Sequence, residues 1–443
     1  MNFDALREGR TLVLGFGREG RALERAVAGR VPEARVEVLC DRMPGVAPKK
    51  WPIRTGTPEA LARTPDRVLR SPGVPARLPG LARWRAEGVE ITCISSLWFG
   101  ARPKANVIAV TGSKGKSTTA ALIAHMLSAE GKTVALGGNI GVPMLDLLDA
   151  RPDWFVVELS SYQLADLQGH ASVAVITRLF PEHQDWHGGV ERYYADKLRI
   201  IDLVGEAPVW INAGDRVLAE AVAGKSGIRA VNLEGEISAS EDGIRHRGQY
   251  VLAAADSPLP GRHNLDNLAL AIGVVDSIAG RTASALKSLA SFRPLPHRLE
   301  RMPGPANTIW FNDSIATTPY ATLAALQAIP ASPVLIVGGM ERGADWQMVV
   351  DYCLAHPLAG LIGLPDNGPA VCRRFVEAGA VDPARVQLAH RMQEAVAYAW
   401  HLSESGGAVL LSPGAPSFPH FRDFEHRGGM FAQALRQLVA RMG

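Results

Sequence analysis

The sequence contains few cysteines and carries little net charge. Its 443 residues include four cysteines, Cys40, Cys93, Cys353 and Cys372, which are too few and too scattered for a disulfide framework or a zinc knuckle. The 47 basic and 44 acidic residues leave a formal charge of +3. A charge so near neutrality does not indicate nucleic acid as the main partner.

Long hydrophobic runs are lacking as well. The longest apolar runs fall short of a membrane span, and the N-terminal stretch MNFDALREGR mixes both charges, unlike a signal peptide. With 47% hydrophobic and 21% charged residues, the composition is that of a globular chain and excludes a disordered one. We therefore expect a cytoplasmic protein without membrane insertion, long enough for two or three domains.

Short apolar runs alternate with longer amphipathic stretches, which predicts α/β domains with parallel sheets and crossover helices. Glycine- and proline-containing segments at 100–104 and 292–298 divide the chain into predicted domains 1–103, 104–296 and 297–443. The polar stretch 233–254 is predicted to be a β-rich excursion within the second domain. The predicted strands are Thr11–Leu14, Val36–Leu39, Val107–Val110, Phe155–Leu159, Val173–Thr177, Val209–Asn212, Ile309–Asn312, Val334–Val337 and Ala408–Leu411.

A phosphate-binding loop is the strongest functional signal. The segment 107–118 (VIAVTGSKGKST) leads from an apolar run into a glycine-containing turn, and apolar residues then recur at helical spacing. Glycines let backbone N–H groups surround phosphate oxygens, a lysine neutralises their charge, and a hydroxyl binds Mg²⁺. The segment departs from G-x-x-x-x-G-K-[ST], because Val110 stands where the first glycine would be. The residues predicted to bind ATP here are Gly112, Ser113, Lys114, Gly115, Lys116, Ser117 and Thr118.

Candidate metal ligands follow this loop. Glu158 ends an apolar run, where it is either solvated or, beside a phosphate loop, a ligand of Mg²⁺. Two histidines lie four residues apart in the segment 179–187 (LFPEHQDWH). Because Pro181 precedes them and two glycines follow, we predict a loop here rather than a helix, with Asp185 and His187 either orienting neighbouring groups or solvated.

Together with the segment 138–141 (GNIG), these motifs resemble those of the Mur ligase family, whose members are ATP-dependent amide-bond-forming enzymes of cell-wall synthesis. The resemblance implies a Rossmann-like N-terminal domain, a central P-loop ATPase-like domain with a mostly parallel sheet, and a Rossmann-like C-terminal domain. It implies catalytic roles for Lys116, Glu158, His183 and Lys197. It also implies two Mg²⁺ ions, held by Ser117, Glu158, His183 and Lys197.

Lys197 would ordinarily be an exposed helix residue. In the family that the chain resembles, the corresponding lysine reacts with CO₂ and becomes a carbamate, which binds metal as a carboxylate does. This reaction requires a neutral amine, which low solvation favours.

The resemblance continues toward the C-terminus. The segments 263–267 (HNLDN) and 296–300 (PHRLE) are similar to the family's H-N-x-x-N and P-H-R-x-E motifs. They imply further ATP contacts from Asn264, Asn267, Arg298 and Asp313. Asn264 is equally suited to be a helix N-cap. The segments 337–345, 411–418 and 424–428 resemble loops that bind the incoming amino acid, which implies glutamate contacts from Thr317, Arg342, Ser417 and Phe424.

The N-terminal motif allows two cofactors. The segment 15–20 (GFGREG) follows a strand, and with Asp41 it would indicate NAD. In the branch of the family that this chain resembles, a first domain of this kind holds UDP instead, and nothing else in the chain supports hydride transfer. We therefore expect no NAD. The residues expected to bind the UDP-linked substrate are Gly17, Arg18, Arg42, Ser71, Pro72, Gly73, Asn139, Ser161 and Gln163.

The ending F-E-x-R-G and the S-P-G loop at 71–73 resemble the glutamate-adding branch. This implies a monomer that joins UDP-MurNAc-L-Ala to glutamate through an acyl phosphate. Enzymes that add D-glutamate read N-D-S-K-A-T, whereas this chain has Ile315 at the lysine position, and Arg342 stands in a loop where a lysine is common. The chain looks more like the L-glutamate-adding variant, whose hosts invert the residue with a separate epimerase; D-glutamate is the alternative.

Three other functions are compatible with parts of the sequence. A folylpolyglutamate-type ligase shares the phosphate loop, but it would normally read G-K-G-S and would lack a UDP domain. A non-catalytic nucleotide-binding regulator would not need the second metal site that Glu158, His183 and Lys197 imply. A dehydrogenase would show an absorbance change with NAD(P)H and a hydroxy acid.

Overall fold

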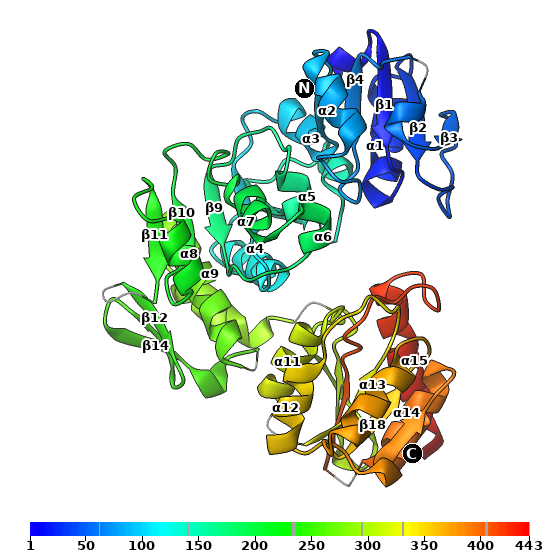
Figure 1. Ribbon diagram of the computed structural model, residues 1–443. Coiled ribbons are helices and arrows are strands. Elements are labelled where there is room, and N and C mark those ends of the chain that lie inside the picture. Colours follow the sequence, from blue (N-terminus) through cyan, green and yellow to red (C-terminus); the bar gives the residue numbers. More distant parts are fainter. Residues whose placement is uncertain are drawn as a thin grey trace. The chain divides into compact units, whose positions relative to one another are not determined.

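The computed structural model describes residues 1–61, 63–139, 141–232, 236–259, 261–293, 296–329, 332–403 and 406–442. The chain divides into two compact units, the first made of residues 1–257 and 263–292 and the second of 258–262 and 293–443 (Figure 1). The boundaries of the three predicted domains stay a prediction, although each predicted domain contains its own mostly parallel sheet. Ile140 of the GNIG motif, Leu233 to Gly235 of the polar stretch, and Pro294 and Leu295 of the second boundary segment lie outside the described residues.

The N-terminal part of the first unit is a five-stranded parallel sheet in the order β3-β2-β1-β4-β5, which matches five of the six strands of the dinucleotide-binding order 3-2-1-4-5-6. Both faces are covered, because Val13 packs with α1 on one face while Leu12 and Leu14 pack with α2 on the other. The elements are η1 (Asp4–Leu6), β1 (Arg10–Leu14), α1 (Arg18–Arg30), β2 (Arg35–Cys40), β3 (Ile53–Thr55), η2 (Pro58–Ala60), β4 (Arg67–Arg70), α2 (Pro79–Ala86), β5 (Glu90–Cys93) and α3 (Ser95–Ala101).

The central part of the first unit is a six-stranded sheet in the order β11-β10-β9-β6-β8-β7, and every pair is parallel. All five residues of β6, the strand that enters the phosphate loop, are buried. The elements are β6 (Val107–Thr111), α4 (Lys116–Ala129), β7 (Val134–Gly138), η3 (Met144–Leu147), β8 (Trp154–Glu158), α5 (Ser161–Leu164), β9 (Val173–Ile176), α6 (Gln184–His187), α7 (Val190–Leu198), β10 (Val209–Asn212), α8 (Arg216–Ala221), β11 (Ile228–Val231), α9 (Arg262–Ala279), α10 (Ala283–Ser288) and η5 (Leu289–Ser291).

The predicted β-rich excursion is confirmed over its described residues. It is an antiparallel three-stranded sheet of β12 (Ile237–Ser240), β13 (Gly243–His246) and β14 (Gln249–Ala253), followed by η4 (Ala254–Asp256). Ile237 and Ile244 supply its buried apolar side chains.

The second unit contains a six-stranded sheet in the order β15-β16-β20-β17-β18-β19, parallel except for β15. Alternate residues of β17 face opposite sides: Leu335 and Val337 pack with α11 to α13, and Val334 and Ile336 pack with α14 and α15. The elements are β15 (Glu300–Pro303), η6 (Pro305–Asn307), β16 (Ile309–Asn312), α11 (Pro319–Ala328), β17 (Pro333–Val337), α12 (Gln347–Ala355), β18 (Gly360–Gly363), α13 (Gly368–Glu377), η7 (Pro383–Arg385), β19 (Val386–Leu388), α14 (Met392–Leu402), β20 (Ala408–Leu411) and α15 (Phe424–Met442).

The nine predicted strands are all present, each within one residue of its predicted ends. Two local predictions are wrong. The segment after Pro181 forms the one-turn helix α6, because His183 and Gly188 adopt left-handed conformations that bracket a single turn. Asn264 is not an N-cap, since α9 begins at Arg262 and places Asn264 within its first turn.

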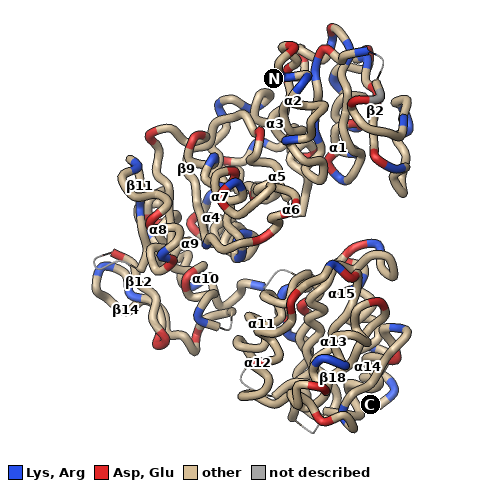
Figure 2. Tube along the Cα trace, in the orientation of Figure 1, with Lys and Arg blue, Asp and Glu red and all other residues tan. Residues whose placement is uncertain are grey.

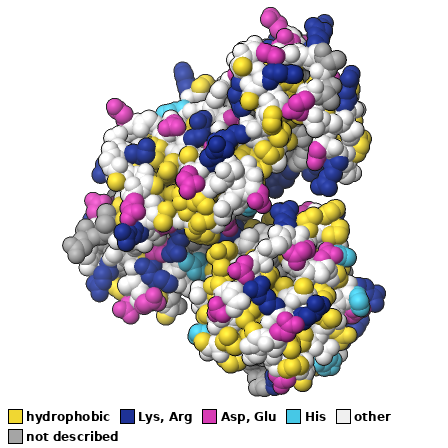
Figure 3. All heavy atoms as spheres, viewed as in Figure 1, with side chains coloured by type: hydrophobic (Ala, Val, Ile, Leu, Met, Phe, Trp, Pro, Cys, Tyr) yellow, Lys and Arg dark blue, Asp and Glu magenta, His cyan; other side chains and the backbone are white. Residues whose placement is uncertain are grey.

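Charged residues of both signs are interspersed along the trace in Figure 2, and acidic and basic side chains are mixed on the face drawn in Figure 3. All four cysteines are buried and unpaired. Among the helices of the described residues, none combines the length and the apolar character needed to cross a bilayer.

Buried contacts join the two sheets of the first unit. Trp98 of α3 is fully buried and meets Phe155 of β8 edge to face at 4.9 Å. Arg70, at the end of β4, is also fully buried, and its guanidinium forms a two-pronged ion pair with Asp166, with N–O distances of 2.8 and 2.6 Å. The same guanidinium donates to the Tyr162 and Val74 carbonyls, so one arginine holds the end of β4 against the central sheet.

Replacing Arg70 by methionine is expected to cost about 3–5 kcal/mol of unfolding free energy, because Asp166 would be left as a buried charge without its partner. Urea unfolding of the full chain measures the change. Arg25→Ala is the matched control, since the Arg25–Asp146 ion pair bridges the same two sheets but Arg25 is 59% exposed; its loss should cost less than about 1 kcal/mol. Equal destabilisation of both variants would contradict this account.

Candidate active site

The phosphate loop follows β6 and opens α4. Gly112 and Gly115 adopt φ values of +145° and +90°, and a Cβ at Gly115 would lie 2.4 Å from the Asn267 amide oxygen. Only glycine fits this close approach and this backbone conformation. The Lys116 amine donates to the Ser113 carbonyl at 3.1 Å. The Lys116 side chain is therefore folded back over the phosphate loop.

Three predicted site residues form a hydrogen-bonded chain beside this loop. The Ser117 hydroxyl donates to one carboxylate oxygen of Glu158, and the Asn139 amide donates to the other at 2.9 Å. Ser117 and Glu158 are both buried. They meet because β8 lies next to β6 in the parallel sheet, so the carboxyl ends of the two strands share one edge.

Lys197 points from α7 into the same edge of the sheet. Its side chain is buried, and its amine donates to the Gly112 carbonyl at 2.6 Å. Burial, reinforced by repulsion from Lys116, holds the pKa of this amine well below its usual range. The low solvation that the sequence analysis required for a neutral amine is therefore present.

His183 and Glu182 complete this group. His183 is exposed at the surface, yet desolvation by the surrounding protein lowers the pKa of its imidazole to about 4. Glu182 pairs with Lys114 at 2.9 Å, and the attraction of Lys114 and Lys116 overcomes the opposing effect of burial to lower the carboxyl pKa. The imidazole is thus neutral at neutral pH, as a metal ligand must be.

The residues present fit magnesium by the chemistry of their donors. Ser117 and Glu158 offer the hard oxygen atoms that Mg²⁺ prefers, and a carbamylated Lys197 would add more. As the side chains stand, no group of three or more histidine, cysteine, aspartate and glutamate residues with metal-site geometry occurs in the described parts of the chain. The fit of these residues to magnesium therefore depends on Ser117 and on a carbamylated Lys197.

Two of the residues predicted to bind ATP, Asn264 and Asn267, lie on α9. Asn264 and Asn267 are buried, and the Asn267 amide donates to the Asn264 side-chain oxygen at 3.2 Å. Asn267 also lies against Gly115. This pair therefore lies next to the phosphate loop.

The residues predicted to hold the UDP-linked substrate lie in the N-terminal part and in the central part of the first unit. Ser71 donates to the Gly15 carbonyl at 2.7 Å, and Trp186 donates to the Gly73 carbonyl at 3.2 Å. Arg18 reaches the backbone carbonyl of Asn139 at 3.3 Å. These contacts join the G-x-G loop, the S-P-G loop and the central sheet, whereas Arg42 is simply exposed.

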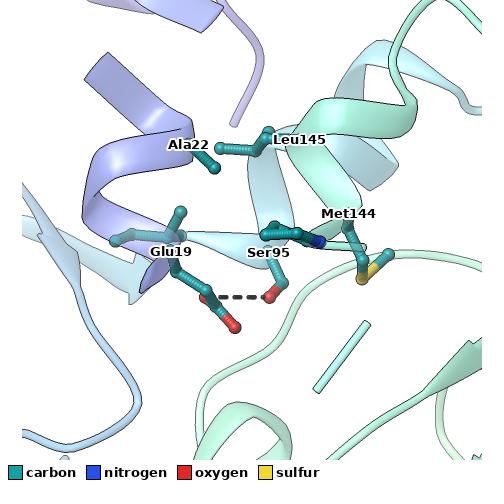
Figure 4. A pocket seen from close by; sticks show the side chains of 7 residues that line it. Glu19, Ala22, Ser95, Met144 and Leu145 are labelled. Carbon is teal, nitrogen blue, oxygen red and sulfur yellow. Dashed lines mark hydrogen bonds between the residues drawn. The ribbon is translucent and has the colours of Figure 1, made fainter. Parts of the chain in front are cut away.

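A shallow pocket lies between α1 and η3 (Figure 4). Glu19 lines it and accepts hydrogen bonds from Gln163 at 2.7 Å and from Ser95 at 3.3 Å. Desolvation outweighs these hydrogen bonds and raises the pKa of Glu19 to about 7. Gln163, predicted to bind the UDP-linked substrate, is thus held by a carboxyl group of α1.

In the second unit, the residues predicted to bind the substrate glutamate lie on, or at the end of, the loops that follow β16, β17 and β20. Ser417 is buried, Thr317 and Phe424 are half-buried, and Arg342 is exposed. Asp313 is buried and accepts from the Ser412 hydroxyl at 3.0 Å and from the Leu299 amide at 3.2 Å. Arg298 lies in the turn just before Leu299.

The fully buried Arg427 of α15 ties these loops together. Its guanidinium donates to the carbonyls of Ser314 at 2.8 Å and Ala415 at 2.9 Å, and to Gly338 at 3.5 Å. Burial lowers the pKa of Arg427 to about 10, against the attraction of Asp313. The motif F-E-x-R-G therefore acts here through its arginine as a structural tie among the three loops.

Four residues that no motif predicted hold the predicted site residues in place: Arg70, Glu19, Asp196 and Arg77. Each lies inside or beside a predicted motif, but each has a partner 96 or more residues away in the chain, namely Asp166 for Arg70, Gln163 for Glu19, and Arg77 and Asp196 for each other. For Arg70, the sequence offered one signal: a charged residue at the end of an apolar strand.

Comparison with known proteins places these motifs in a family. Residues 110–275 match the model of the Mur ligase middle domain. The chain is 40% identical to a UDP-N-acetylmuramoyl-L-alanine–L-glutamate ligase of Micromonospora sp., over 98% of each protein, and 39% identical to the Salinispora tropica enzyme of the same name, over 98% of this chain and 99% of that protein. Its fold is similar to that of the Thermotoga maritima UDP-N-acetylmuramate–alanine ligase MurC, with a TM-score of 0.61, 19% identity, and coverage of 98% and 99%.

Glu19→Gln is expected to leave stability nearly unchanged at pH 4 and to stabilise the protein increasingly as pH rises from 4.5 to 7. The folded-state pKa of about 7 lies above the ordinary value of 4.5, so the contribution of the protonated Glu19 to stability is complete only below pH 4.5 and is lost as pH rises through 7. Glutamine mimics the protonated acid at every pH. Thermal unfolding at pH 4 and pH 8 should show a gain of roughly 3 kcal/mol confined to pH 8; an equal gain at both values would contradict it.

Proposed function

Because this chain belongs to the Mur ligase family and is a ligase, we propose that it joins glutamate to UDP-N-acetylmuramoyl-L-alanine with the cleavage of ATP to ADP and phosphate. The product would be a precursor of peptidoglycan. We propose that the enzyme works as a monomer, and that its G-x-G loop serves the UDP-linked substrate rather than NAD.

The convergence of Lys116, Ser117, Glu158 and Lys197 at one edge of the central sheet supports this proposal most directly. A phosphate loop alone would serve any nucleotide-binding protein. A buried carboxylate and a desolvated lysine beside that loop are expensive to maintain in a protein that only binds a nucleotide, because each is a charged or polar group removed from water.

In the proposed reaction, the carboxylate of the alanyl residue attacks the γ-phosphorus of ATP, and ADP leaves. The carbonyl carbon of the acyl phosphate is then attacked by the glutamate amine; a C–N bond forms, the C–O bond to phosphate breaks, and the amine gives up a proton. Lys116 would lie along the transferred phosphoryl group and balance its charge. Asn264 and Asn267 would hold the nucleotide, and Asn139, Ser161 and Gln163 the alanyl end of the acceptor.

Magnesium, held by Ser117, Glu158, His183 and Lys197, would neutralise phosphate oxygens and lower the repulsion between the two anionic reactants. The protein side chains prepare that role. His183 is kept neutral by desolvation, and Glu158 is kept in place by Ser117 and Asn139. Arg298 and Asp313 of the second unit are proposed to contact the phosphates and the ribose of ATP.

We propose L-glutamate as the amino acid. The two relatives compared above carry L-glutamate in their names, and Ile315 stands where a lysine occurs in enzymes that add the D-isomer. Thr317, Arg342, Ser417 and Phe424 are the proposed pocket. The exposed Arg342 offers a guanidinium that pairs with a carboxylate through two parallel hydrogen bonds.

Phosphate release from ATP tests the proposed function. The purified chain should release phosphate with UDP-MurNAc-L-Ala and L-glutamate together, and not when either is omitted. Turnover with D-glutamate alone would overturn the proposed stereochemistry but keep the ligase. Silence with both isomers, together with turnover on a folate substrate and glutamate, would replace the proposal with a folylpolyglutamate-type ligase.

Carbamylation of Lys197 predicts a dependence on CO₂. Stripping CO₂ from the buffer should lower the rate at least about tenfold, and added bicarbonate should restore it, because a metal ligand is lost and regained. Lys197→Arg, which cannot form the carbamate, should be inactive with and without bicarbonate. Full activity of the wild-type enzyme in CO₂-free buffer would rule the modification out as a requirement.

A further inference from the structure

A second polar network lies next to the proposed site, and the proposed reaction leaves it without a role. His187 of α6 sits between two polar partners: its Nδ1 lies 2.7 Å from a carboxylate oxygen of Asp196, and its Nε2 lies 3.0 Å from the Ser161 hydroxyl. All three residues are at most 3% exposed. A buried polar chain of this kind is maintained only if each member is satisfied.

The network reaches the N-terminal sheet through Arg77. Its guanidinium binds both oxygens of Asp196, at 2.8 and 2.6 Å. Arg77 follows the S-P-G loop by four residues, and Asp196 immediately precedes Lys197. The chain of contacts therefore runs from the loop proposed to hold the UDP-linked substrate to Ser161, the first residue of α5.

The partners of His187 determine which of its nitrogen atoms carries the proton. A carboxylate can only accept hydrogen bonds, so the nitrogen that faces Asp196 must be the donor. Tyr162, Trp186 and Tyr193 also contact the ring. With the proton on Nδ1 facing Asp196, Nε2 is the atom that accepts from the Ser161 hydroxyl.

We propose that Arg77, Asp196 and His187 are positioning residues that fix the direction of the Ser161 hydroxyl. Ser161 donates its proton to His187 Nε2, so its oxygen presents lone pairs, not a proton, on the other side. The ligand group that matches this arrangement is an amide N–H. In the substrate of the proposed function, which this inference presupposes, that group is the N–H of the alanyl residue.

The tautomer of His187 gives a test that does not depend on turnover. In protein labelled with ¹⁵N-histidine, the His187 resonances are identified by their loss in His187→Gln. At neutral pH we expect a protonated Nδ1 and an unprotonated Nε2. A proton on Nε2, alone or together with one on Nδ1, would overturn the proposal, because Ser161 would then be an acceptor toward His187.

Kinetics separate positioning from a purely structural role. Ser161→Ala should raise the KM for UDP-MurNAc-L-Ala about tenfold, the loss expected for one hydrogen bond, and should leave the KM for ATP within about twofold. His187→Gln should do the same, and the double variant should be no worse than Ser161→Ala, because His187 acts through Ser161. Additive losses, or an equal rise in both KM values, would overturn the proposal.

Arg77 and Arg25 form a matched pair for the contact with the N-terminal sheet. Both are part-exposed arginines that pair with an aspartate of the central region, but Arg25 binds Asp146, away from the network. Arg77→Ala should raise the KM for UDP-MurNAc-L-Ala several-fold with the KM for ATP unchanged, Arg77→Lys should fall between it and the wild type, and Arg25→Ala should change neither KM. Equal effects of Arg77→Ala and Arg25→Ala would contradict a specific role of Arg77.

The two kinds of measurement keep this inference apart from the proposed function. A wild-type protein that fails to turn over UDP-MurNAc-L-Ala would refute the proposed function, and the ¹⁵N spectrum would still decide the tautomer. Conversely, normal turnover with an Nε2-protonated His187 would keep the proposed function and refute the positioning role.

Discussion

The hydrogen bond from the buried Lys197 amine to the Gly112 carbonyl is the contact on which the rest of the site depends. It closes α7 over the phosphate loop and places a nitrogen atom near Glu158, and desolvation holds the pKa of this amine well below its usual range. Repulsion from Lys116 lowers the pKa further.

The N-terminal sheet contributes to this site through arginines that cross to the central sheet. Arg70 and Arg77 each bind an aspartate that is itself nearly buried, and each lies beside the S-P-G loop. Separating such a pair leaves a nearly buried aspartate without its counter-charge, so arrangements in which the partners are apart are penalised. The two pairs therefore specify how the S-P-G loop meets the central sheet. In the second unit, Arg427 has the corresponding effect on three loops through three carbonyls and the Ser314 hydroxyl.

Much of this architecture was predictable because parallel sheets have buried strands. The apolar runs at 107–110 and 334–337 are each followed by a glycine-rich turn and an amphipathic stretch. This pattern predicts a buried strand of a parallel sheet. Among the missed strands, β3 and β19 are short and partly exposed edge strands, and their sequences carry little apolar signal. The segment at 183–187 was predicted as a loop because its flanking residues break helices. In the structure it forms a single helical turn between two residues in left-handed conformations, His183 and Gly188.

By itself, the sequence determined the phosphate loop, the order of the motifs and the family, because these depend on residues that are close together in the chain. Tertiary structure alone decided that Lys197 is desolvated, that Glu158 is held by Ser117 and Asn139, and that His187 joins Asp196 to Ser161. Each of these properties depends on burial and on partners brought in by other elements. Spacing along the chain specifies which strand end a residue occupies, but the solvation and the hydrogen bonds of its side chain arise only when the sheet has assembled around it.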